Sequence, residues 1–103
     1  MATVVFTPAD DVYISQYYSN QNFWGSNHLF CGQFDGTGDI YRGLLRFDLS
    51  SIPASSTVNA AKLKLYIDRN DSPGLTKQIN VWAALHDYNQ FEVTWANQPL
   101  IGG

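Results

Sequence analysis

The chain has 103 residues, of which 45% are hydrophobic and 15% charged, and its formal net charge is −3 at pH 7. This length fits a single domain over residues 1–103, and the six Lys and Arg residues are too few and too scattered to form the basic surface that nucleic-acid binding needs. No apolar run approaches the 18 or so residues of a transmembrane helix, so we expect no membrane span.

Several stretches have the alternation or composition of β-strands. In chain order they are residues 3–6, 11–17, 28–34, 40–49, 58–68, 78–86 and 91–95. Pro8 separates the first two, because proline cannot donate to a strand ladder. Between the third and fourth, Gly36 and Gly38 can take the positive φ angles that tight turns require.

The clearest strand signal lies in residues 40–49. Every second position is hydrophobic or glycine: Tyr41, Gly43, Leu45, Phe47 and Leu49. Arg42, Arg46 and Asp48 fall on the other parity, so they share the opposite face of the strand. Leu44 interrupts the alternation, which predicts that this opposite face is also partly covered.

The two following strands alternate just as regularly. Strict alternation in 58–68 and 78–86 argues against helix, and only residues 87–90 are expected to form a turn or a short helical stub. The predicted core is Val12, Ile14, Leu45, Phe47, Leu63, Leu65, Ile67, Val81, Leu85 and Trp95. Short strands separated by turns predict an all-β fold, an antiparallel jelly-roll-like β-sandwich.

Five short motifs occur in a characteristic order: Pro8–Tyr13, Asn22–Ser26, Arg42–Pro53, Lys62–Ile67 and Val93–Pro99. The ordered set resembles the DNRLRE domain family, which overlaps the alginate-type carbohydrate-binding modules. The resemblance implies a jelly-roll sandwich and a binding or structural function, not hydrolysis. Domains of this kind continue for several strands after the Trp-x-Asn-x-Pro turn, so the resemblance covers about the N-terminal two thirds of a domain.

We therefore expect a sandwich that is incomplete at its C-terminal end. Such a sandwich exposes strand edges and an apolar face, and residues 78–85 carry no charge that would keep other strands away. Two explanations stay open: the chain is a fragment of a longer one, or a strand-completing partner chain supplies the missing strands.

Aromatic residues gather beside the polar loop 19–22. Tyr17, Tyr18, Phe23 and Trp24 flank it, and flat aromatic rings can stack on the C–H faces of sugars while Asn and Gln amides pair with hydroxyls. The alternative is that these rings close one end of the sandwich.

Arginines on strand 40–49 suggest a second ligand chemistry. Arg42 and Arg46 could bind the carboxylates of an anionic sugar, in a groove that Lys62 and Lys64 would widen. The alternative is a half-solvated ion-pair network with Asp48. The predicted carbohydrate-binding residues are Tyr18, Trp24, Arg42 and Arg46.

No catalytic or metal constellation emerges. Asp10 with Asp11, or Asp35 with Asp39, could hold a structural Ca²⁺, but neither pair resembles a calcium loop, so no cofactor is expected. The isolated His28 and His86 lack metal-ligand spacing, and Cys31 is expected to be a buried, inert thiol. Asp87 and Glu92 invite comparison with glycosidase carboxylates, but the resemblance implies no enzyme.

Two functions are compatible with these features. The first is a non-catalytic carbohydrate-binding module that recognises a polysaccharide. The alternative is a structural, self-associating surface protein of a spore coat, filament or cell-envelope layer, whose partners are other copies of itself. Residues 1–6 do not have the pattern of a signal peptide, and either function places the protein outside the cell or on a spore or cell surface.

Overall fold

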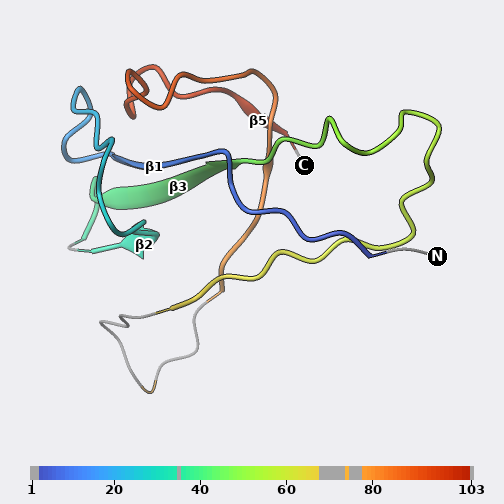
Figure 1. Cartoon of the computed structure of the whole chain (residues 1–103). Coiled ribbons are helices and arrows are strands. Elements are labelled where there is room, and N and C mark those ends of the chain that lie inside the picture. Colours follow the sequence, from blue (N-terminus) through green and yellow to red (C-terminus); the bar gives the residue numbers. More distant parts are fainter. Residues whose placement is uncertain (1–2, 35, 68–73, 75–77, 103) are drawn as a thin grey trace.

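The computed structural model describes residues 3–34, 36–67, 74 and 78–102. The strands are β1 (Asp10–Ser15), β2 (Gly32–Gln33), β3 (Ile40–Arg46), β4 (Ala83–Ala84) and β5 (Ile101–Gly102). They form a three-stranded sheet in the order β1-β3-β2 (Figure 1) and a two-stranded sheet of β4 and β5. All pairs are antiparallel and the described residues contain no helix, which confirms the all-β class.

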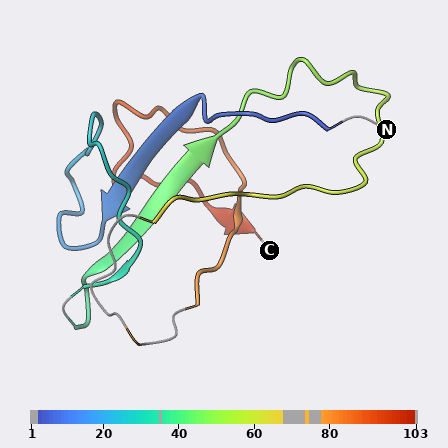
Figure 2. The ribbon, with the colours of Figure 1, turned by 60° about the horizontal axis from the view of Figure 1, so that its bottom comes forward.

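Strands β1 and β3 are the centre of the molecule. They run in opposite directions side by side (Figure 2), with Asp10 opposite Arg46 at one end and Ser15 opposite Tyr41 at the other. The predicted strands 11–17 and 40–49 are confirmed in position, although both end earlier than expected. β1 stops where the Ser15 hydroxyl accepts a hydrogen bond from the Tyr18 backbone N–H, because this bond turns the chain out of the ladder.

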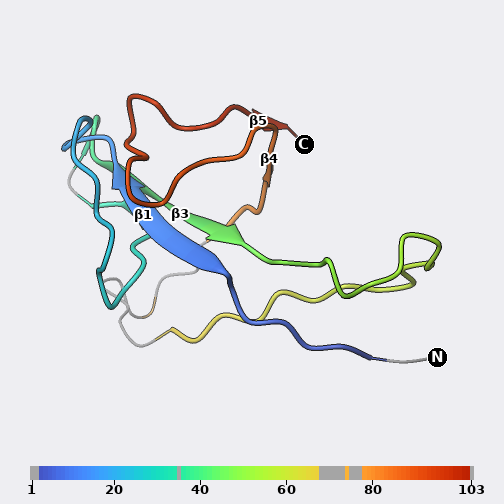
Figure 3. The same ribbon diagram turned by 45° about the horizontal axis from the view of Figure 1, so that its top comes forward.

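The core lies on one face of this strand pair. Val12 and Ile14 of β1 are buried with Val93, and Leu44, Tyr88 and Trp95 pack against them. The segment that carries residues 88–95 passes over this face (Figure 3). The predicted core positions Val12 and Ile14 are confirmed, and Trp95 is a half-buried neighbour of the core.

The opposite face of β1 and β3 is covered by an aromatic group. Tyr13 is buried there, stacked on Phe23 at 4.4 Å between ring centroids and edge-on to Phe30 at 5.2 Å. A side chain at Gly43 would meet the Cys31 sulfur at 3.2 Å, which explains a glycine inside the strand. Both faces of the β1–β3 pair are thus covered, as the break in alternation at Leu44 predicted. Cys31 itself is exposed, so the prediction of a buried thiol is wrong.

The outer predicted strands are shorter or absent. Segments 3–6 and 58–67 are extended without ladder pairing, 91–95 lies in turns, and two-residue strands are all that form within 28–34 and 78–86. Asp68, the last residue of one predicted strand, lies outside the described residues. The core prediction is wrong at five positions, whose side chains are exposed to solvent: Leu63, Leu65, Ile67, Val81 and Leu85. The apolar face of a strand is buried only where a second layer covers it, and among the described residues no second layer covers segments 58–67 and 78–85. The two remaining predicted core residues, Leu45 and Phe47, are half-buried.

The predicted turns are better reproduced than the outer strands. Gly36 and Gly38 have φ angles of 72° and 85°, as the turn before β3 requires. Backbone N–H groups of Glu92 and Val93 donate to the Asn89 carbonyl, which closes a turn next to the expected 87–90 position. Nowhere in the described part of the chain is there a helix long and apolar enough to cross a bilayer.

Candidate functional site

Two exposed aromatic rings from distant segments of the chain lie in contact on the surface. Trp24 and Phe91 each expose 56% of their surface, and their ring centroids lie 4.9 Å apart at an interplanar angle of 53°. Because they are 67 positions apart in the chain, a tertiary contact brings them together. We call this pair the aromatic platform. Large apolar side chains left side by side in solvent commonly mark a binding surface.

Asn22 holds the aromatic platform in place. Its side-chain N–H group donates to the backbone carbonyls of Gln90 (2.9 Å) and Val93 (2.8 Å), and its carbonyl oxygen accepts from the Trp24 N–H at 3.0 Å. One half-buried amide therefore joins the loop that carries Trp24 to the turn that carries Phe91. Gly25 then takes a φ of 86°, which turns the chain directly after Trp24.

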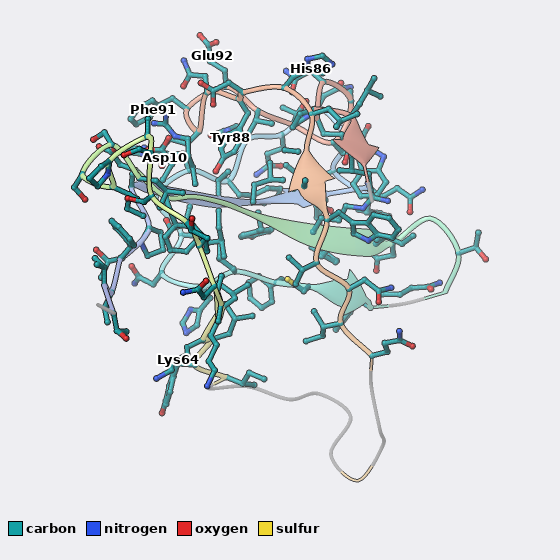
Figure 4. The ribbon with its side chains drawn as sticks, turned by 90° about the vertical axis from the view of Figure 1, so that its right-hand side faces the viewer. Asp10, Lys64, His86, Tyr88, Phe91 and Glu92 are labelled. Atoms are coloured by element: carbon teal, nitrogen blue, oxygen red, sulfur yellow. The ribbon has the colours of Figure 1, made fainter. Side chains whose placement is uncertain are left out.

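A shallow depression adjoins Phe91. Its volume is about 460 Å³, and it is lined by Asp10, Arg46, Asp87, Tyr88, Asn89, Gln90 and Phe91. Figure 4 shows Asp10, Tyr88 and Phe91 close together at this end of the molecule. The volume falls within the usual range for small-ligand sites, and the lining combines two aromatic rings with carboxylates and amides.

An ion pair forms one wall of the depression. The Arg46 Nε donates to the Asp10 carboxylate at 2.7 Å, and the Arg46 Nη2 lies 2.5 Å from the same oxygen. The Arg46 Nη1 lies 3.9 Å from an Asp87 carboxylate oxygen. The hydrogen bond and the charge of Asp10 raise the pKa of the Arg46 guanidinium. The cross-strand register that places Asp10 opposite Arg46 creates this pair. The ion-pair interpretation of Arg46 is thus observed, with Asp10 and not Asp48 as the hydrogen-bonded partner.

Tyr88 carries a polar group without a partner. Its hydroxyl is buried and makes no hydrogen bond to any described residue. Burial, followed by the negative charge of Asp10, raises the pKa of Tyr88 to about 12. A buried hydroxyl without a partner is destabilising, because it loses its water without gaining a hydrogen bond.

Replacing Tyr88 by Phe should therefore raise the free energy of unfolding by ~1 kcal/mol, measured by urea denaturation at neutral pH. The gain should grow between pH 10 and about 12. In that window the unfolded tyrosine ionises while the folded one stays neutral, so the wild type loses stability that the variant keeps. A loss of stability in Tyr88→Phe would show that the hydroxyl has a partner after all.

The sequence-predicted site residues separate into two groups. Trp24 contacts Phe91 on the aromatic platform, and Arg46 lines the adjoining depression. Tyr18 is half-exposed and packs edge-on against Tyr17 and Phe23. Arg42 lies elsewhere: its guanidinium is 4.7 Å from the Trp95 ring centroid, and it donates to the Gln98 side chain at 2.8 Å.

The lysines proposed to widen an anionic groove are not part of the depression. Lys64 lies at the opposite end of the molecule from Phe91 (Figure 4), and the extended segment 58–67 carries Lys62 as well. Conversely, Tyr88 and Phe91 were not predicted as site residues. Their only sequence signal was aromatic character next to an expected turn, and it did not reveal their neighbours.

The two candidate calcium pairs fare differently. Asp10 is engaged by Arg46, which already supplies its positive charge. Asp39 is buried and one of its carboxylate oxygens has no partner in the described structure, but Asp35 lies outside the described residues. Within residues 3–34, 36–67, 74 and 78–102, no group of three or more His, Cys, Asp or Glu side chains could hold a metal ion.

An all-β framework with a solvent-exposed aromatic platform and a shallow polar depression is typical of a binding domain. The family model of carbohydrate-binding module family 96 matches residues 2–103, so the chain belongs to this family. Carbohydrate-binding modules are non-catalytic, and the chain is not an enzyme. No curated protein and no solved structure matches the chain.

Proposed function

We propose that the chain binds a polysaccharide at the aromatic platform and the depression beside it. The observation that carries this proposal is the pair of rings, Trp24 and Phe91, held half-exposed by the three hydrogen bonds of Asn22. A sugar that stacks on these rings removes its apolar face from water. Because the hydrogen bonds of Asn22 already hold the rings in place, their side chains lose little conformational entropy on binding.

The depression adds polar groups that can read hydroxyl positions. Asp10, Asp87, Asn89 and Gln90 provide acceptors, and the amides also provide donors. Arg46 is paired with Asp10, and Arg42 lies over the Trp95 ring and donates to Gln98, but each guanidinium keeps further N–H donors. These donors can bind either the hydroxyls or the carboxylates of a sugar.

Several finer statements belong to the same proposal. We infer that residues 1–103 form one DNRLRE-like domain whose complete form is a jelly-roll sandwich. Carbohydrate-binding modules usually act outside the cell, which supports an extracellular or cell-surface location.

Self-association is the alternative function, and one observation bears on it. Apolar side chains of the extended segments 58–67 and 78–85 are exposed, among them Leu65, Ile67 and Val81. Sizing chromatography of the 103-residue chain, run with and without glycan, separates the two functions. A monomer that binds glycan supports carbohydrate binding, and an oligomer that does not bind glycan supports self-association.

The direct test removes one ring of the aromatic platform. Trp24→Ala and Phe91→Ala should each weaken retention on the bound polysaccharide by roughly 30-fold, equivalent to ~2 kcal/mol, the usual effect of truncating a central aromatic contact. Affinity electrophoresis against a panel of neutral and uronate polysaccharides measures both the ligand and the loss. Trp24 is half-exposed, so its removal should leave the folded state intact.

Tyr66→Ala is the matched control. Tyr66 is 92% exposed and lies two residues from Lys64 in the chain, and Lys64 is far from Phe91 (Figure 4). This variant should bind as the wild type does. Equal retention of Trp24→Ala and wild type, with both folded, would contradict the proposed site.

A further inference from the structure

A second hollow lies next to the depression. Its volume is about 230 Å³, and it is lined by Ala9, Arg46, Phe47, Asp48 and Leu49. Arg46 also lines the depression, so the two share this side chain as a common wall. We call the second one the outer hollow, because it lies past the end of β3.

The outer hollow repeats the chemistry of the depression. Leu49 is 54% exposed and Phe47 is half-buried, which gives an apolar surface. Asp48 supplies a carboxylate, and hydrogen bonds from Ser50 lower its pKa, so it is ionised at neutral pH. The backbone bond from the Ala9 N–H to the Arg46 carbonyl (2.7 Å) fixes the two strand ends that form it.

The shared side chain is itself accessible. Arg46 exposes 49% of its side chain although it is paired with Asp10. A guanidinium has five N–H donors, and the contacts with Asp10 and Asp87 do not use all of them. A ligand that lies across Arg46 can therefore accept a hydrogen bond there while touching both hollows.

We propose that the depression and the outer hollow are successive subsites for one linear glycan chain, which crosses Arg46 between them. This inference rests on the proposed function and makes it more specific: the ligand is a run of several sugars bound along its length, not a single sugar or a chain end. The aromatic platform stacks on one part of the run, and Leu49 with Phe47 contacts a later part.

Chain length is the property that tests this inference. The probes are cello-, manno- and oligomannuronate ladders from disaccharide to hexasaccharide, titrated by calorimetry against the whole chain. In the ladder that binds, affinity should rise by about tenfold or more from disaccharide to hexasaccharide, which corresponds to about 1.4 kcal/mol. Trp24→Ala should weaken binding of every length.

Leu49→Arg and Leu49→Ala should remove only the gain with length, since they alter the outer hollow and leave the aromatic platform untouched. Leu65→Arg is the matched control, because Leu65 is about as exposed as Leu49, at 53%, and lines neither hollow. Comparison of the two Leu49 variants guards against a fold damaged by the new charge.

The possible failures are distinguishable. Equal affinity for all lengths, or an unchanged length dependence in both Leu49 variants, overturns the two-subsite inference and leaves the proposed function standing. Absence of binding to every ladder and every polysaccharide overturns both.

Discussion

Ile14→Ala is expected to lower the free energy of unfolding by about 2–5 kcal/mol, the usual cost of truncating a fully buried aliphatic side chain. Ile14 exposes 0% of its surface and packs in the centre of the only buried cluster of the described residues, with Val12 and Val93. The cluster is small, so few neighbours can move to fill the cavity. Urea denaturation followed by tryptophan fluorescence measures the loss.

Leu65→Ala provides the contrast. Leu65 has the same alternating sequence context as Ile14 but exposes 53% of its surface, so its truncation should change the free energy of unfolding by less than about 0.5 kcal/mol. Similar losses for the two variants would mean that segment 58–67 is covered in solution, as the original core prediction required.

Asn22→Ala is the second change with a large expected effect, because one side chain makes three hydrogen bonds. Its removal leaves the carbonyls of Gln90 and Val93 without their donor, which should cost about 1–3 kcal/mol of stability. It also releases the Trp24 N–H, so the aromatic platform loses its fixed geometry. Glycan retention should fall nearly as far as in Trp24→Ala, although Asn22 does not belong to the platform.

Asn20→Ala is the matched control, since Asn20 is an exposed asparagine of the same loop. It should keep both stability and retention. If Asn22→Ala loses stability but retains full binding, the amide is structural only, and the platform does not depend on it.

Part of this protein could be predicted from local sequence. Alternation identified β1 and β3, and it placed Val12 and Ile14 on a buried face, because side chains of a strand point to opposite sides in turn. The positive φ angles of Gly36 and Gly38 were also predictable, since two glycines in a short polar segment between strands indicate a tight turn. These features need no information from distant residues.

The outer segments show where alternation stops being informative. Residues 58–67 and 78–85 alternate as regularly as β3, yet Leu65 and Val81 are exposed. The pattern says which face of a strand can be buried. It does not say whether another layer lies against that face, because that layer comes from elsewhere in the chain or from another molecule.

The candidate site depended on tertiary structure in the same way. The sequence indicated Trp24, Arg42 and Arg46 as ligand residues, but it did not indicate that Arg42 lies over the Trp95 ring, apart from the other two. Phe91 became a candidate only through its contact with Trp24, which the hydrogen bond from Asn22 to Gln90, 68 residues away in the chain, supports. The sequence alone therefore determined the residue types and the local strand faces. Long-range hydrogen bonds and packing decided which aromatic and charged side chains share a surface, because no local rule fixes contacts between distant segments.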